Sequence, residues 1–220
     1  DTLLDLLASE FCPRAARVSE LLSAVSSKIS RARFRQLLDS AGPLGRTRLV
    51  EFTVYTLPVD LPRPLLHAML RESNSRTVRA ALASIRSRPA PEDVGLVLDL
   101  LDSREADVLA ETLETLRVLD AWVDPSTLDR LLGHESAPVR AEALELMRRL
   151  DPPATVEAAL RLLRDPSTSV RRTAFLALWS LRGPGALERT LAIYLQDDGD
   201  LRELAAAYLL RHRGWVRPRL

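Results

Sequence analysis

Apolar residues recur at helical spacing along most of the chain. In the segment STSVRRTAFLALWSL (residues 167–181), Val170 is followed by apolar residues four, seven, eight and eleven positions later. These positions fall on one stripe of an α-helix. No stretch shows the alternating pattern that indicates a strand. The pattern therefore predicts an all-α protein.

The same segment has counterparts elsewhere in the chain, and their leading apolar residues align. We call these five aligned residues the anchors: Val78, Val108, Val139, Val170 and Leu201. They are 30 or 31 residues apart, and a second column keeps the same period: Leu100, Leu131, Leu162 and Ile193. A fixed period of this size indicates a repeat in which each unit is a pair of helices.

Prolines and polar residues fall between the expected helices or in their first turns, where a missing N–H costs least. A Ser, Thr, Asn or Asp precedes most anchors and is expected to cap the second helix of the pair. The N-terminal part fits the same pairing with Val18 and Val50 as weaker anchors, and its expected helices span 2–9, 14–28, 31–40 and 46–57. The prediction is an α-solenoid of about seven antiparallel helix pairs.

We expect one continuous domain with three segments that differ in regularity. These are degenerate helical repeats over 1–70, regular repeats over 71–213 and a C-terminal tail over 214–220. Phe52 and Tyr55 face outward if Val50 is the anchor, but Phe52 turns to the core if Leu49 is, and packing in the core is favoured.

Charge and composition exclude several classes of function. The net charge is +1, so nothing favours nucleic acid as the partner. Of 31 basic residues only Lys28 is lysine, which gives a surface rich in planar donors. The single cysteine, Cys12, cannot form an intrachain disulfide and is expected near the core.

No apolar run is long enough to cross a bilayer, and a cytoplasmic location is the expectation. The chain starts at Asp1 rather than Met, so we expect a processed or trimmed protein. The three histidines, His67, His134 and His212, lie in different repeats. No metal-ligand spacing, phosphate loop or nucleophile motif is found, so neither a metal nor a cofactor is expected.

The candidate binding residues lie opposite the predicted stripe on the second helices. Subtracting 31 from Trp179 gives Arg148 and then Arg117, with Glu145 and Glu114 beside them. Phe175, aligned with Leu144 and Leu113, is placed on the flank, and Arg172 and Arg182 complete the candidate set. Three interpretations stay open for the aromatic residues. A neighbouring helix or the tail with Trp215 covers them, they form an exposed interface anchor, or they were left bare by removal of a flanking domain.

A second arginine column follows the anchors: Arg79, Arg140, Arg171 and Arg202, with Leu109 as the exception. Such arginines can bond the acidic turn residues or helix-end carbonyls of the adjacent repeat, as a structural ladder. The alternative is a row that binds phosphate or carboxylate groups.

The arrangement LLRDPSTSVRRTAFLALWSL (residues 162–181) resembles a HEAT-like repeat of the short bacterial type, and the resemblance is strong over 71–213. It implies a right-handed superhelix of the HEAT-like or ARM type, with second helices lining a concave face where partners bind. The family includes scaffolds, adaptors, chromophore lyases and some DNA glycosylases.

We therefore expect a non-enzymatic scaffold or adaptor that recognises a protein, such as an acidic or extended segment, on the concave face. One alternative is a DNA glycosylase, for which Asp120 or Asp151 near Trp179 would be the catalytic carboxylate, or a chromophore-lyase-type enzyme. Another is a regulatory domain of a larger membrane or signalling protein. The last helix is apolar nearly all round, which predicts a covering tail or a homodimer through the C-terminal end.

Overall fold

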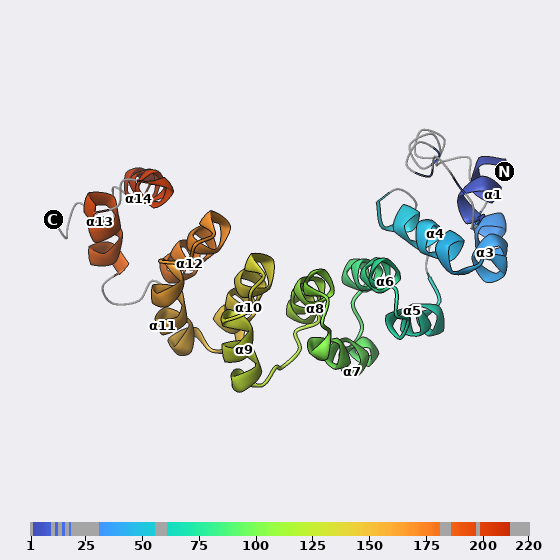
Figure 1. Ribbon diagram of the computed structural model, residues 1–220, viewed down its shortest axis with the longest axis horizontal. Coiled ribbons are helices and arrows are strands. Elements are labelled where there is room, and N and C mark those ends of the chain that lie inside the picture. Colours follow the sequence, from blue (N-terminus) through green and yellow to red (C-terminus); the bar gives the residue numbers. More distant parts are fainter. Residues whose placement is uncertain are drawn as a thin grey trace. The chain divides into compact units, whose positions relative to one another are not determined.

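The structure is a computed structural model that describes residues 2–9, 12, 15, 18, 31–55, 61–180, 186–196 and 199–211. Within these residues all regular structure is helical. The chain divides into two compact units, Asp1–Ala121 and Trp122–Leu220. Each unit is a stack of helix pairs, so the predicted all-α solenoid is confirmed (Figure 1). None of the described helices is long and apolar enough to cross a membrane.

In the first unit, the second helices of the last three helix pairs lie side by side, and the first helices of the last two pairs form another layer (Figure 1). The helices are α1 (Thr2–Ala8), α3 (Arg31–Ser40), α4 (Pro43–Tyr55), α5 (Arg63–Leu70), α6 (Ser75–Ser87), α7 (Val94–Leu98) and α8 (Ala106–Val118). Short 3₁₀ turns flank α7, at Pro91–Asp93 and Asp99–Asp102, so the helix expected there is only partly α-helical. The expected helix over 14–28 lies largely outside the described residues.

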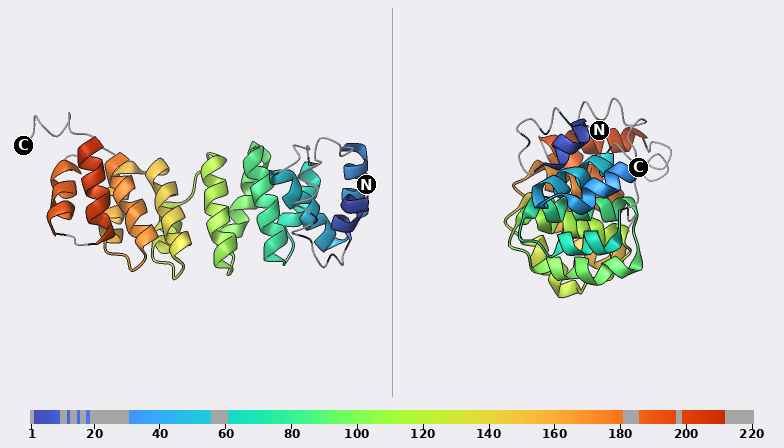
Figure 2. Two further views of the ribbon diagram at one scale, coloured as in Figure 1. Left: turned by 90° about the horizontal axis from the view of Figure 1, so that it is seen from above. Right: turned by 90° about the vertical axis from the view of Figure 1, so that its right-hand side faces the viewer.

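In the second unit, α10 (Ala137–Leu150), α12 (Thr168–Ser180) and α14 (Asp200–Arg211) form one layer. Their partners α9 (Pro125–Leu132), α11 (Pro152–Leu162) and α13 (Ala186–Gln196) form the other (Figures 1 and 2). In each unit, consecutive second helices pack on one another as well as on their own partners.

The anchor residues form the core, as the period predicts. All five are buried, with at most 4% of each side chain exposed. Among the weaker anchors, Val18 and Val50 are buried too, and so are Leu49, Phe52 and Cys12. Phe52 therefore packs in the core, as expected, whichever residue is taken as the anchor.

Prolines and caps define the helix starts. Pro125, Pro138 and Pro152 stand in first turns. Asn74 caps α6 by accepting hydrogen bonds from two backbone N–H groups, as expected for a second helix. Ser136, before α10, makes no such bond, whereas Asp124 and Asp151 cap the first helices α9 and α11. The expectation of capped second helices was therefore only partly correct.

A single glycine sets how closely two N-terminal helices approach. Gly45 is buried in the first turn of α4, and a Cβ added there would lie 1.7 Å from the carbonyl oxygen of Ala8. Any side chain would push α4 away from the C-terminal end of α1. Arg48, also on α4, donates from Nη1 to the carbonyl oxygen of Ser9 at 2.8 Å and strengthens the same contact.

Candidate functional site

Three side chains on α12 share one face of the helix. Arg172, Leu176 and Trp179 follow one another at spacings of four and three residues, which places them in a row. Arg172 is exposed, Leu176 is 43% exposed and Trp179 is half-buried. We call this row the α12 ridge. It forms the outer surface of a helix that packs on α10, α11 and α14.

Phe175 does not belong to this surface, and the expectation that it flanks an outer face was wrong. It is buried against Leu201 and Ala205 of α14, with Ile193 and Tyr194 of α13 also packed on this cluster. Its repeat equivalents, Leu144 and Leu113, are buried as well. A second helix packs on its neighbours in the layer as well as on its own partner, so its buried arc is wider than one stripe. For Phe175, the interpretation that a neighbouring helix covers it is therefore correct.

On α10, which packs against α12, the two candidate residues bond to each other. Arg148 donates from Nε and Nη2 to a carboxylate oxygen of Glu145, with the Nη2 bond 2.8 Å long. Both side chains are partly exposed. The guanidinium of Arg148 thus already has an acidic partner on its own helix.

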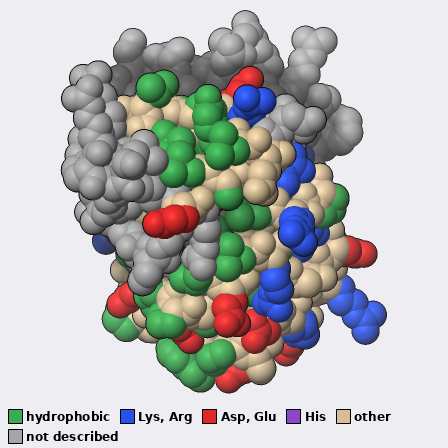
Figure 3. Space-filling view, turned by 90° about the vertical axis from the view of Figure 1, so that its left-hand side faces the viewer, with side chains coloured by type: hydrophobic (Ala, Val, Ile, Leu, Met, Phe, Trp, Pro, Cys, Tyr) green, Lys and Arg blue, Asp and Glu red, His purple; other side chains and the backbone are tan. Residues whose placement is uncertain are grey.

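The apolar surface continues onto the last helix pair. Leu210 of α14 is 74% exposed, and it occupies the repeat position of Trp179 and Arg148. Leu195 of α13 is also strongly exposed. Figure 3 shows hydrophobic side chains gathered on this end of the molecule. Arg182, His212 and the tail over 214–220 with Trp215 lie outside the described residues.

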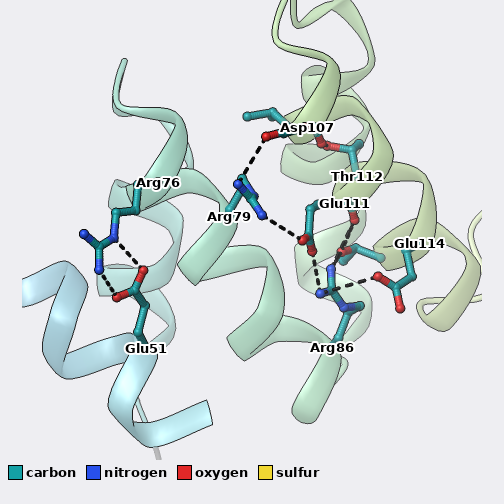
Figure 4. Close-up of polar contacts among 10 residues, drawn as sticks. Glu51, Arg76, Arg79, Arg86, Asp107, Glu111, Thr112 and Glu114 are labelled. Carbon is teal, nitrogen blue, oxygen red and sulfur yellow. Dashed lines mark hydrogen bonds and ion pairs between the residues drawn. The ribbon is translucent and has the colours of Figure 1, made fainter. Parts of the chain in front are cut away.

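The remaining candidates, Glu114 and Arg117, belong to α8 of the first unit. Glu114 faces Arg86 of α6 at 3.5 Å, and Arg86 also lies 2.5 Å from a carboxylate oxygen of Glu111 (Figure 4). Within the described residues Arg117 forms no ion pair, and its buried Nε has no acceptor. The structure therefore pairs Glu114 with a neighbouring helix rather than with Arg117.

The column of arginines after the anchors makes four different sets of contacts. Arg140 is buried and donates two hydrogen bonds, 2.7 and 2.8 Å long, to both carboxylate oxygens of Asp165, in the turn before α12. Its third nitrogen donates to the carbonyl oxygens of His134 and Glu135. Arg140 thus joins one helix pair to the next, which is the contact that a structural ladder requires.

The other members of this column are less similar. Arg79 reaches Asp107 at 3.4 Å, whereas Arg171 donates to the carbonyl oxygens of Asp165 and Pro166 in its own turn. The guanidinium of Arg202 lies 5.5 Å from the centre of the Tyr194 ring. Leu109, which interrupts the column, is buried.

The electrostatics of the Arg140–Asp165 pair follow from these bonds. Burial raises the pKa of the Asp165 carboxyl, but hydrogen bonds from Arg140 and from the Ser167 N–H outweigh it and lower the pKa below its usual value. The hydrogen bonds that Arg140 donates to Asp165 raise the pKa of Arg140, and they outweigh burial, which lowers it. Both groups therefore stay charged at neutral pH.

Two polar or aromatic features were missed by the sequence analysis. Trp122 is 67% exposed between buried Ala121 and Val123. Its signal in the sequence was its place outside the expected helices, in the short connection just before the start of α9. Asp93 is fully buried and bonds both Arg63 and His67 of α5. A helical pattern gives no sign of this pair of contacts, because Asp93 stands in a 3₁₀ turn.

The two aspartates considered for catalysis have structural places. Asp151 caps α11 by accepting a hydrogen bond from the Ala154 N–H at 3.0 Å. Asp120 has a positive φ of 56°, in the turn that follows α8. The residues that the structure describes contain no group of three or more His, Cys, Asp or Glu able to hold a metal ion.

Comparison with known proteins agrees with this architecture. No curated protein matches the chain. Residues 125–211 match the family model of HEAT repeats, from the first residue of α9 to the last residue of α14. The helix pairs of the second unit therefore match HEAT repeats, which supports the resemblance of the chain to the HEAT-like repeat family.

Proposed function

We propose that this protein is a non-enzymatic binding scaffold or adaptor, and that it recognises a protein partner on the α12 ridge. The observation that supports this most is the row formed by an exposed arginine, an exposed leucine and a half-buried tryptophan on one helix face. Tryptophan and arginine are enriched among the residues that dominate binding energy at protein interfaces.

The neighbouring helices extend the surface in a way that suits an apolar partner. On α14, Ala207 and Leu210 occupy the repeat positions of Leu176 and Trp179, and both are exposed. On α10, the same positions hold the Glu145–Arg148 pair. Apolar side chains on α12 and α14 therefore have a charged border on α10, which is the arrangement of an interface centre with a polar rim.

The repeat architecture gives further support. A HEAT repeat protein often mediates protein interactions, because stacked helix pairs expose a long row of similar surfaces. Each second helix adds side chains to this surface while its anchor stays in the core. A difference between two repeats at one surface position, such as Trp179 on α12 where α10 has Arg148, can then create a specific binding site on a regular fold.

The proposal is tested with Leu176→Asp in the full chain. Leu44→Asp is the matched control, because Leu44 is 39% exposed in the first turn of α4 in the other unit. Proteins captured by the tagged wild type and both variants are compared by quantitative mass spectrometry. A captured protein is then purified and its affinity measured by calorimetry.

We expect a partner that binds the wild type and Leu44→Asp equally and binds Leu176→Asp at least about tenfold more weakly, because a charge replaces apolar contact in the interface. Circular dichroism must show that both variants keep the helical content and melting temperature of the wild type. Equal affinity of a purified partner for all three proteins would contradict the proposal.

A further inference from the structure

The α12 ridge contains an arginine that makes no ion pair within the described part of the chain. Arg172 is exposed, and it has neither a hydrogen-bond acceptor nor a carboxylate partner there. Its neighbour Arg171 differs, because its guanidinium bonds to Asp165 and Pro166 in the preceding turn and to Thr168 at the start of α12. The charge of Arg172 is therefore available to a binding partner.

Arg148 is the natural comparison, because it borders the same surface. To bind an external carboxylate it must first leave Glu145, to which two of its nitrogens donate. The free energy of that internal pair is lost before the new one forms. Arg172 has no such competitor, so it contributes more to recognition of an acidic group than Arg148 does.

The charges around Arg172 also indicate what kind of acid it meets. Glu203 on α14 occupies the same repeat position as Arg172, and Ala141 occupies it on α10. Glu203 is exposed, so positive and negative charges follow one another along this row. A polyanion such as nucleic acid would meet the Glu203 carboxylate as well as the guanidinium, which disfavours it. A single carboxylate beside apolar side chains fits better.

We propose that the partner on the α12 ridge is an acidic, amphipathic protein segment in which one Asp or Glu side chain pairs with Arg172 while neighbouring apolar side chains contact Leu176 and Trp179. This inference rests on the proposed function, since it names the chemistry of the partner at the same surface. Arg172 sets the charge preference, and Leu176 and Trp179 provide the apolar contact area.

The test is a selection from a phage-displayed library of random 16-residue peptides on the 220-residue chain. Binding phage are counter-selected against Leu176→Asp, so that only ridge-dependent peptides remain. Parallel selections use Arg172→Gln and Arg148→Gln, which remove one positive charge each. Individual enriched peptides are synthesised with their acidic residue as Glu, Gln or Lys, and their affinities are measured by fluorescence anisotropy.

We expect peptides with an Asp or Glu next to apolar residues from the wild type and from Arg148→Gln, and no acidic enrichment from Arg172→Gln. Replacing that Glu by Gln should weaken binding to the wild type by about threefold to fivefold, and leave binding to Arg172→Gln unchanged. A larger loss in Arg148→Gln than in Arg172→Gln would overturn the assignment to Arg172.

The outcomes separate the two proposals. Ridge-dependent peptides without acidic residues would overturn the inference about Arg172 and leave the proposed function standing. The absence of any peptide that depends on Leu176 would overturn both. If light scattering shows that the wild type self-associates and Leu176→Asp does not, the occupant of the ridge is a second copy of the chain, and the inference is wrong.

Discussion

Arginines join successive helix pairs in both units, but they do so in different surroundings. In the second unit, Arg140 and Asp165 form a two-bond pair whose side chains are 11% and 4% exposed. In the first unit, Arg86 of α6 lies between Glu111 and Glu114 of α8 (Figure 4), and these side chains are more exposed, at 19%, 24% and 39%. Arg140 and Asp165 are buried and pair with each other. Arg86, by contrast, is partly exposed and faces two carboxylates.

The difference teaches that an ion pair in a repeat protein must be judged by its surroundings. Removing one member of a buried pair leaves the other charge without water or a partner, which is costly. Removing one member of a partly exposed cluster leaves charges that water and neighbouring residues can still solvate. The four predictions below test this contrast, and they begin with the largest effect.

Arg140→Ala should destabilise the second unit most. The change removes the guanidinium that donates to the buried Asp165 carboxylate and to two carbonyl oxygens, so the carboxylate keeps the Ser167 N–H but loses its charged partner. We expect a loss of about 3 kcal/mol in the free energy of unfolding, at the lower end for a broken buried pair because Asp165 lies in a turn rather than within a helix.

Urea unfolding followed by tryptophan fluorescence measures this loss, because all three tryptophans, Trp122, Trp179 and Trp215, belong to the second unit. The control is Arg172→Ala, which should change stability by less than about 0.5 kcal/mol. If the two variants were equally stable, the enclosed pair would be no more important than a surface arginine.

Acid should weaken the same contact in the wild type. The pKa of Asp165 is below its usual value in the folded protein, so the pair contributes stability above the unfolded-state pKa of about 3.9. This stability is lost as pH falls through the lower pKa of the folded state. Asp165→Asn should cost about 1.5–3 kcal/mol at neutral pH, the range for a hydrogen bond to a charged group.

The measurement is the fluorescence-detected unfolding free energy between pH 7 and pH 3. Below about pH 4, the wild type should lose more stability than Asp165→Asn, and the two curves should converge. Parallel curves over the whole range would mean that Asp165 has an ordinary pKa in the folded protein.

The repeat period was enough to predict the fold and its core. Each anchor is buried, because the same position of every second helix lies on the apolar stripe that packs in the core. The pattern of a single helix could not show which further positions the adjacent second helices cover. Phe175 was for that reason placed on the surface, although α14 covers it.

Polar partners were harder to predict, because they depend on side chains of the adjacent helix. Glu114 and Glu145 occupy equivalent positions, yet Glu145 bonds Arg148 on its own helix and Glu114 faces Arg86. The repeat alignment did contain a sign that Glu114 pairs with Arg86. Arg86 on α6 occupies the position where α10 has the buried Met147. A charged residue at a repeat position that is otherwise apolar indicates an oppositely charged partner on the adjacent helix.

Arg86→Ala should have an intermediate effect, confined to the first unit. Arg86 donates to Thr115 Oγ1 at 3.1 Å as well as pairing with Glu111, but Glu111 keeps Arg79 at 3.6 Å after the change. We expect a loss of about 1 kcal/mol, at the upper end for partly exposed pairs.

Far-ultraviolet circular dichroism should detect this loss, because it follows helices in both units, while tryptophan fluorescence should not change. Arg104→Ala, at an exposed position of the same unit, is the control and should leave both signals unaltered. A loss as large as that of Arg140→Ala would remove the contrast between the two units.

Arg148→Ala should have the smallest effect on stability. Its pair with Glu145 spans three positions of one helix and both side chains are partly exposed, so it contributes about 0.3–0.5 kcal/mol. The fluorescence-detected unfolding free energy should fall by that amount in low salt, and the difference should shrink in 1 M salt, which screens surface charges. A loss above about 1 kcal/mol, insensitive to salt, would show that Arg148 is held as firmly as Arg140. The exposure of an ion pair would then not predict how much the pair contributes to the stability of this protein.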